Sequence, residues 1–278
     1  MDGVNVNDWV GRAADEHGTI SPTIAAQLHA TIGDANEAAP QQGDLVPGLW
    51  HWCGFPPLTH VSDLGPEGHS KSGALLPPIG SNRRMWAGGG FRFHAPLRVG
   101  DPLQQRSSVR SIVEKEGATG PLLLITVDHA ISGPEGLAIE ERQDIVLLNV
   151  PKQFTPPKTR AMPSVTEATH AASEIILFRY SALTFNAHRI HYDLGYVQNV
   201  EKYPGLVVHG PLLATLLLRH AVEKRGQMPR HFEFRGVHPL FAGTDLEICS
   251  QEDGDALALF AGQNGHQGMS ATATWKDI

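Results

Sequence analysis

The stretch His209-Gly-Pro-Leu-Leu-Ala-Thr-Leu-Leu-Leu218 decides the fold, because it opens a helix that is apolar on nearly every side. Proline is well tolerated at the first helical position, where the N–H that it lacks would be unpaired anyway, so the predicted helix runs from Pro211 to about Arg225. A helix that is apolar all round is buried on all sides. A curved antiparallel sheet wrapped around the helix would bury it in this way, and the predicted fold class is α+β.

Two similar series of strands are predicted, one in each half of the chain. Each series begins with an alternating pair, Phe91-Arg-Phe93 or Phe232-Glu-Phe234, followed by a similar turn, 96–101 or 239–246. Glycine-rich turns separate the later strands, as in an antiparallel meander. These strands are expected at roughly 103–115, 121–132 and 138–150, and again at 244–251, 255–262 and 268–275. The repetition indicates a duplicated unit whose copies have diverged.

A linker is expected between the two units. Residues 151–164 hold four prolines and three cations and show no periodic pattern, which is typical of an extended connection. The sequence therefore predicts an N-terminal unit over 1–150 and a C-terminal unit over 165–278.

The N-terminal unit has no equally apolar helix. The counterpart of the long helix, at about 47–59, is short and is broken by Pro56-Pro57. Two amphipathic stretches precede it, at about 7–16 and 22–32, and Ser21 is placed to cap the second of them. We therefore expect the central helix of this unit to be degenerate.

The composition excludes several classes of protein. The 278 residues carry a formal net charge of −7, so no overall field draws the chain to nucleic acid or an anionic membrane. The longest apolar runs, of about eight residues, are too short to span a bilayer, and residues 1–8 lack the basic and apolar regions of a signal peptide. Cys53 and Cys249 stand alone, which fits a reducing cytoplasm and gives no cysteine metal site.

Candidate catalytic groups gather just before the long helix. Asn186, His188, His191 and Asp193 lie within eight residues of one another. A histidine titrates near neutral pH and can act as base or acid, while a helix N-terminus offers free N–H groups to a developing negative charge. Together they indicate acid–base chemistry on a carbonyl compound.

Residues 178–220 resemble the hydratase motif of the MaoC-like, (R)-specific enoyl-CoA hydratases and dehydratases, whose hot-dog fold wraps an antiparallel sheet around one helix. In that resemblance His191 matches the catalytic histidine, and His209-Gly210 matches the His-Gly that precedes the helix. Asn186 stands where the family usually has its catalytic aspartate, and His188 stands where it usually has an asparagine. An amide cannot accept a proton at neutral pH, so proton transfer would fall to His191, helped by His188 or by the other unit.

The exact residues of the motif over 178–193, together with the stretches 83–89 and 96–101, are most similar to one branch of that family. The branch holds the mesaconyl-C4-CoA and itaconyl-CoA hydratases and the 3-hydroxyacyl-thioester dehydratases type 2. The resemblance implies a double hot-dog in which two antiparallel sheets each wrap a central helix, the N-terminal helix being degenerate. It also implies a homodimer.

The expected activity is that of a hydro-lyase that adds water to a 2-enoyl-CoA or dehydrates a 3-hydroxyacyl-CoA, with a short branched or dicarboxylic acyl group. The alternatives are a hot-dog thioesterase and a non-catalytic module that binds acyl-CoA or an acyl carrier. His191, Asn186 and His188 are the expected catalytic side chains, and Gly210 and Leu212 are the expected N–H donors, because Pro211 has none.

The expected substrate-binding residues come from both units. Arg83 and Arg84, beside Trp86, can hold an anion, either a second carboxylate or a CoA phosphate. His209 and Leu212 are expected to bind substrate at the start of the helix. No cofactor and no metal is expected, because zinc would need more ligands than the pair His188 and His191. A hydrogen-bonded structural role for these two histidines is the other interpretation.

Overall fold

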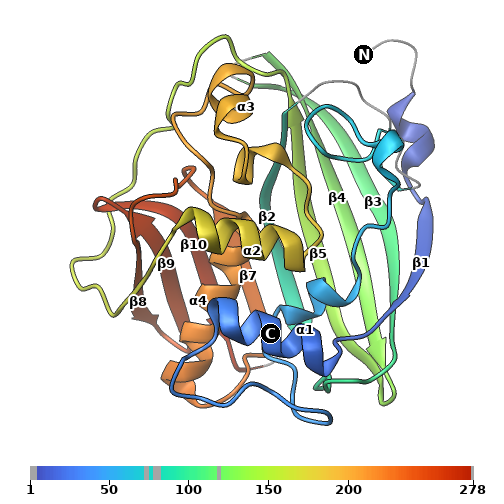
Figure 1. Ribbon diagram of the computed structural model, residues 1–278, viewed down its shortest axis with the longest axis vertical. Helices are drawn as coiled ribbons and strands as arrows, with labels where there is room; N and C mark the ends of the chain where they lie inside the picture. Colours follow the sequence, from blue (N-terminus) through green and yellow to red (C-terminus); the bar gives the residue numbers. More distant parts are fainter. Residues whose placement is uncertain (1–4, 72–74, 78–82, 118–119, 277–278) are drawn as a thin grey trace.

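The computed structural model describes residues 5–71, 75–77, 83–117 and 120–276. Their strands form one ten-stranded antiparallel sheet, which curves around the helices α2 and α4 (Figure 1). The strands are β1 (Ala13–Gly18), β2 (Arg83–Phe93), β3 (Leu103–Gly117), β4 (Gly120–Gly133), β5 (Gly136–Leu148), β6 (Ala168–His170), β7 (His231–Gly236), β8 (Leu246–Asp253), β9 (Ala256–Gln263) and β10 (His266–Thr274). The α-helices are α1 (Pro22–Ile32), α2 (Glu174–Leu183), α3 (Leu194–Asn199) and α4 (Gly210–Arg225), and the 3-10 helices are η1 (Val6–Trp9), η2 (Trp50–Gly54), η3 (Val61–Asp63) and η4 (Arg189–His191).

The strand order repeats itself in mirror fashion about the middle of the sheet. It runs β1-β3-β4-β5-β2-β7-β10-β9-β8-β6, so β2 corresponds to β7, and the meander β3-β4-β5 corresponds to β8-β9-β10. The predicted meanders are therefore confirmed, with boundaries within a few residues of those expected. The topology agrees with a duplicated unit.

The two sheets that we expected are continuous with each other. β2 and β7 pair over Gly88–Arg92 and 231–235, which places Phe91 directly opposite Phe232. A Cβ on Gly89 would lie 2.4 Å from the carbonyl oxygen of Arg142 and 2.8 Å from the ring of Phe234. The glycines of Gly88-Gly-Gly90 thus serve close packing at this junction.

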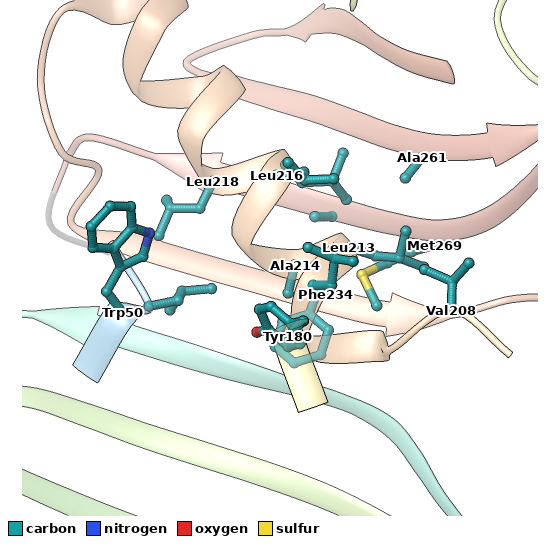
Figure 2. Packing of buried hydrophobic residues seen from close by; sticks show 14 of the residues in the cluster. Trp50, Tyr180, Val208, Leu213, Ala214, Leu216, Leu218, Phe234, Ala261 and Met269 are labelled. Atoms are coloured by element: carbon teal, nitrogen blue, oxygen red, sulfur yellow. The ribbon is translucent and has the colours of Figure 1, made fainter. Parts of the chain in front are cut away.

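Helix α4 lies where the sequence predicts it and is buried as predicted. Its leucines and alanines, among them Ala214, Leu217 and Leu218, are almost wholly inaccessible. The helix contacts β7, β9 and β10, and Leu218, midway along it, belongs to the same buried cluster as Trp50 of the N-terminal half (Figure 2). The helix ends at Gly226, whose φ of 69° is the left-handed conformation usual at this position. Both halves of the chain therefore share one core around α4.

The N-terminal half has only the five-residue η2 in the place of a central helix, as expected. Helix α1 matches the predicted 22–32, and the Ser21 side chain accepts a hydrogen bond from the Ile24 N–H at its start. The stretch 7–16 does not form the single helix expected: η1 ends at Trp9, and the chain turns at Gly11, which has a φ of 82°. From Ala13 it pairs as β1 along β3, because an edge of the sheet is available to it. Residues 1–4, where the search for a signal peptide begins, lie outside the described residues.

Candidate active site

His191 is fixed by two hydrogen bonds between the segment around η4 and the segment that leads into α4. The Val207 N–H donates to the Ile190 carbonyl at 2.9 Å, and His191 Nδ1 lies 2.7 Å from the Val207 carbonyl oxygen. Because a carbonyl oxygen only accepts, Nδ1 carries the proton and Nε2 keeps its lone pair. Nε2 makes no hydrogen bond with the described residues. The imidazole is therefore held as a neutral base.

His209 supports His191 from one side. The two rings are stacked, with centroids 3.6 Å apart and an interplanar angle of 17°. His209 Nε2 lies 2.8 Å from the Ser181 hydroxyl on α2, and Tyr180 packs against the ring edge-on. His209 is fully buried and supports His191 from within the protein core; its expected contact with the substrate stays a prediction.

The N-terminus of α4 begins directly beside this stack. The first N–H of the helix with a backbone partner is that of Leu213, which donates to the His209 carbonyl. Gly210 and Leu212 donate to no acceptor among the described residues, as the helical geometry requires. Trp86 packs over this turn, and a Cβ on Gly210 would lie 3.1 Å from its ring. Only glycine allows the indole to sit against the helix start without displacement.

Leu212 contributes through its backbone alone. Its side chain is buried and faces a small cavity of about 100 Å³, between α4 and the ends of α1 and β6. The side chain points into the core, so the expected contact of Leu212 with the substrate falls to its N–H. This N–H remains a candidate donor.

His188 and His69 extend the row of imidazoles. The ring of His188 stands edge-on to His191 with centroids 5.6 Å apart, and His69 lies 4.2 Å from His188 on the other side. The loop that carries His69 approaches closely because Gly68 has no side chain: a Cβ there would lie 1.8 Å from the Ala187 carbonyl oxygen. His188 is only 4% exposed, and its Nε2 is buried without a hydrogen-bond partner.

Asn186 shapes the turn that presents His188. Its Oδ1 accepts a hydrogen bond from the His188 N–H at 3.0 Å, and the preceding Phe185 has a φ of 50°. The left-handed conformation is unusual for a bulky residue, and it marks a backbone held by its surroundings. The amide NH₂ of Asn186 has no partner among the described residues and can donate to a ligand.

The histidines of the site are neutral at physiological pH. Burial lowers the pKa of His191 to about 4, and burial together with the charge of Arg84 lowers the pKa of His69 to about 3. Burial and the neighbouring imidazoles hold the pKa values of His188 and His209 well below the usual range. Among the described residues, no group of three or more His, Cys, Asp or Glu side chains could hold a metal ion.

The two neighbouring arginines have different surroundings. Arg83 is buried and donates from Nε to Glu201 Oε2 at 2.8 Å and from Nη2 to the Glu201 carbonyl, and its guanidinium lies over the Tyr203 ring. These contacts occupy the cation, so the structure contradicts our expectation that Arg83 binds a substrate anion. Arg84 is half-buried and has no carboxylate within 4.0 Å in the described part of the chain.

Arg189 and Asp193 form a paired support beside the histidines. Arg189 donates from Nε and Nη2 to Asp193 Oδ2, at 3.0 and 2.7 Å, and Asp193 Oδ1 caps α3. A cavity of about 600 Å³ opens here, lined by both residues and by Glu67, Tyr196 and Glu201 among others. None of His188, His191 and Gly210 lines this cavity. The candidate site therefore remains at the histidines and the start of α4, beside the cavity.

Several of these residues could not be found from the sequence. His69 and Glu201 carry no motif, and they reach the site through loops that pack against 186–191 and β2. Gly68 was the available signal, since a glycine before a histidine in a loop permits close approach of the backbone. Ser181 lies within the stretch 178–220, but a hydroxyl in a helix gives no sign of a distant histidine partner.

Comparison with known proteins identifies the family of the chain. Residues 49–242 match the family model of hydroxyacyl-thioester dehydratase type 2. The chain belongs to this family. A mesaconyl-C(4)-CoA hydratase of Chloroflexus aurantiacus is 41% identical over 268 residues, which is 95% of each chain. The family resemblance seen in 178–220 is thereby confirmed.

Solved structures confirm the double hot-dog fold. A MaoC-like dehydratase from Phytophthora capsici superposes with a TM-score of 0.72 at 15% identity, covering 99% of this chain and 98% of its own. A Mycobacterium tuberculosis protein described as a double hot-dog fold superposes with a TM-score of 0.56 at 14% identity, covering 95% of both. At such identities the likeness concerns the fold alone. In the described part of the chain, no helix is long and apolar enough to cross a membrane.

Proposed function

We propose that the protein is a hydro-lyase that reversibly adds water to a 2-enoyl-CoA thioester, or equally dehydrates a 3-hydroxyacyl-CoA. The observation that carries this proposal is the position of the neutral His191, stacked at 3.6 Å on the residue that caps α4. A base with a free Nε2 thus lies beside N–H groups that can stabilise a developing negative charge by donating hydrogen bonds. The mesaconyl-C(4)-CoA hydratase at 41% identity supports the same reaction class and a short dicarboxylic acyl group.

In the dehydration direction, Nε2 of His191 takes the proton from Cα of the 3-hydroxyacyl thioester. The electron pair moves toward the thioester oxygen, where the N–H groups of Gly210 and Leu212 stabilise the enolate. The Cβ–O bond then breaks, the double bond forms, and the leaving hydroxide takes up the proton from the His191 imidazolium to depart as water. Hydration is the reverse. The Asn186 amide orients the water, since it can donate and accept but not ionise.

We place catalysis in the unit 165–278 and propose that the unit 1–150 shapes the acyl end of the pocket, with 151–164 as the linker. Trp86 on β2 supports this division, because it brings the N-terminal unit against the start of α4. A cytoplasmic location is supported by Cys53 and Cys249, which are both free thiols.

We also propose a homodimer. Ile175 and Phe178 lie one helical turn apart on α2 and are 69% and 65% exposed, an apolar pair of the kind that a partner surface covers. Sedimentation velocity should give twice the mass of the 30.1 kDa chain at micromolar concentration. If the wild type sediments as a monomer at that concentration, and Phe178→Glu has the same mass, the dimer is excluded.

The activity can be tested with two optical signals in one assay. A hydro-lyase removes the absorbance of the enoyl-thioester chromophore and releases no thiol, whereas a hot-dog thioesterase releases free CoA that a thiol-reactive dye detects. A non-catalytic module binds the thioester with neither signal. Crotonyl-CoA and mesaconyl-C(4)-CoA are the first substrates to compare.

The pH profile should reflect the depressed pKa of His191. Dehydration needs the neutral imidazole, and its pKa is lowered to about 4, so activity should persist as the pH falls below the usual histidine value of about 6.5. We expect kcat/KM to be level between pH 8 and about 5 and to fall with unit slope below about 4. Circular dichroism at each pH is the control for unfolding. An acid limb near 6.5 would show that His191 is not the base, or that it is not buried.

A further inference from the structure

Arg84 lies on the face of the sheet that carries the active site. Arg84 and Trp86 are two residues apart in the regular part of β2, so their side chains point to the same face. Trp86 packs against Gly210 at the start of α4. The Cα atom of Arg84 therefore lies about 7 Å along the strand from that of Trp86, the residue that covers the proposed thioester site.

Among the described residues, Arg84 has no carboxylate within ion-pair distance, unlike the neighbouring arginines. Arg83 is paired with Glu201, and Arg189 is paired with Asp193. No carboxylate of the described residues comes within 4.0 Å of Arg84, although Glu67 is near enough to influence its charge. Burial lowers the pKa of Arg84, but a guanidinium stays protonated at neutral pH. A half-buried cation without a carboxylate at contact distance favours the binding of an anion.

A second observation comes from His188, whose pKa is lowered by burial and also by the charge of the nearby Arg84. Nε2 of His188 is buried and lacks a hydrogen-bond partner, and its ring lies between His69 and His191. Nearly all buried polar atoms have partners, so an orphaned one indicates a ligand or a solvent molecule. An anion held by Arg84 would offer its oxygens to this nitrogen and to His69.

We propose that Arg84, with His69 and His188, binds the free carboxylate of an unsaturated diacid whose other end is the CoA thioester. This assignment rests on the proposed hydro-lyase function and names the residues that select its substrate class. The ring centroids of His188 and His191 are 5.6 Å apart, so the carboxylate lies only a few bonds from the carbon that His191 deprotonates. The acyl group is therefore a short diacid. A CoA phosphate does not fit, since the pantetheine arm separates it from the thioester.

The test compares a diacid thioester with its neutral counterpart. Wild-type protein and Arg84→Met are assayed with mesaconyl-C(4)-CoA and with crotonyl-CoA, and Arg92→Met is the matched control, because Arg92 is an exposed arginine farther along β2. A lost charge-assisted carboxylate contact should lower kcat/KM for the diacid thioester by roughly 10- to 100-fold. The value for crotonyl-CoA should change by less than about threefold. His69→Gln should reduce activity on the diacid in the same selective way, to a smaller extent.

The outcomes separate this inference from the function on which it rests. Equal losses on both substrates, or a wild type that prefers crotonyl-CoA, would overturn the carboxylate site while leaving the hydro-lyase intact. No loss of enoyl absorbance with either substrate would overturn the function itself. If Arg84→Met does not fold, Arg84→Lys keeps the charge but loses the two-pronged geometry, and its expected defect is again confined to the diacid.

Discussion

His191→Ala should lower kcat/KM for the enoyl thioester by about 10²- to 10⁴-fold, the usual contribution of a positioned general acid–base group. The variant keeps the stacked His209 and the N–H groups of α4, so substrate should still bind and KM should change much less than kcat. The decrease in enoyl absorbance under steady-state conditions measures the effect. The thermal transition of the variant shows whether the fold is intact.

His170→Ala is the matched control for this loss. Burial also lowers the pKa of His170 to about 4, but this residue lies at the end of β6 beside Arg219, where it lines the small cavity that the Leu212 side chain faces, and not in the row of histidines. Its removal should leave kcat/KM within about twofold of the wild type, as expected of a substitution outside the site. Full activity in His191→Ala would show that the proton is transferred by another group.

Phe232→Ala should lower the free energy of unfolding by about 3–5 kcal/mol. Phe232 is fully buried and stands opposite Phe91, where β2 and β7 join the two halves of the sheet. Its loss leaves a cavity at the junction, and the close register of the two strands restricts collapse around it. Urea unfolding followed by circular dichroism gives the free energy.

Leu58→Ala serves as the control for this substitution, since Leu58 is 83% exposed and its replacement should change the free energy of unfolding by no more than about 0.5 kcal/mol.

One cooperative transition is expected in the wild type, because α4 and the junction of β2 with β7 join both halves into one core. Two separate transitions, with only one of them shifted by Phe232→Ala, would contradict that description.

The sequence was informative wherever the structure depends on local periodicity. A helix that is apolar nearly all round over its first turns, 211–218, and glycine-bounded alternating strands are properties of short windows, and they appear nearly where expected. His191 and the His209-Gly210 pair belong to one motif, so their proximity could be predicted. The edge-to-edge join of β2 and β7 is a pairing of distant segments that no local pattern specifies.

The substrate-facing residues were harder to predict for the same reason. Arg83 and Arg84 cannot be told apart from the sequence. Only the three-dimensional position of Glu201 shows that Arg83 is neutralised by an ion pair, whereas Arg84 has no such pair among the described residues. Nothing in the sequence distinguishes His69 from other loop histidines. It reaches the site because the backbone at Gly68 packs closely against the Ala187 carbonyl. Stretch 7–16 has an amphipathic pattern that a helix or an edge strand can satisfy, and the free edge of β3 decides between them.

A crystal structure with an unreactive acyl-CoA analogue bound would test the central claim most directly. The account predicts a thioester oxygen about 2.7–3.1 Å from the N–H of Gly210 or Leu212. It also predicts Cα about 3–3.5 Å from Nε2 of His191. An acyl group bound instead in the cavity lined by Glu67 and Tyr196, with no contact to His191 or the start of α4, would contradict it.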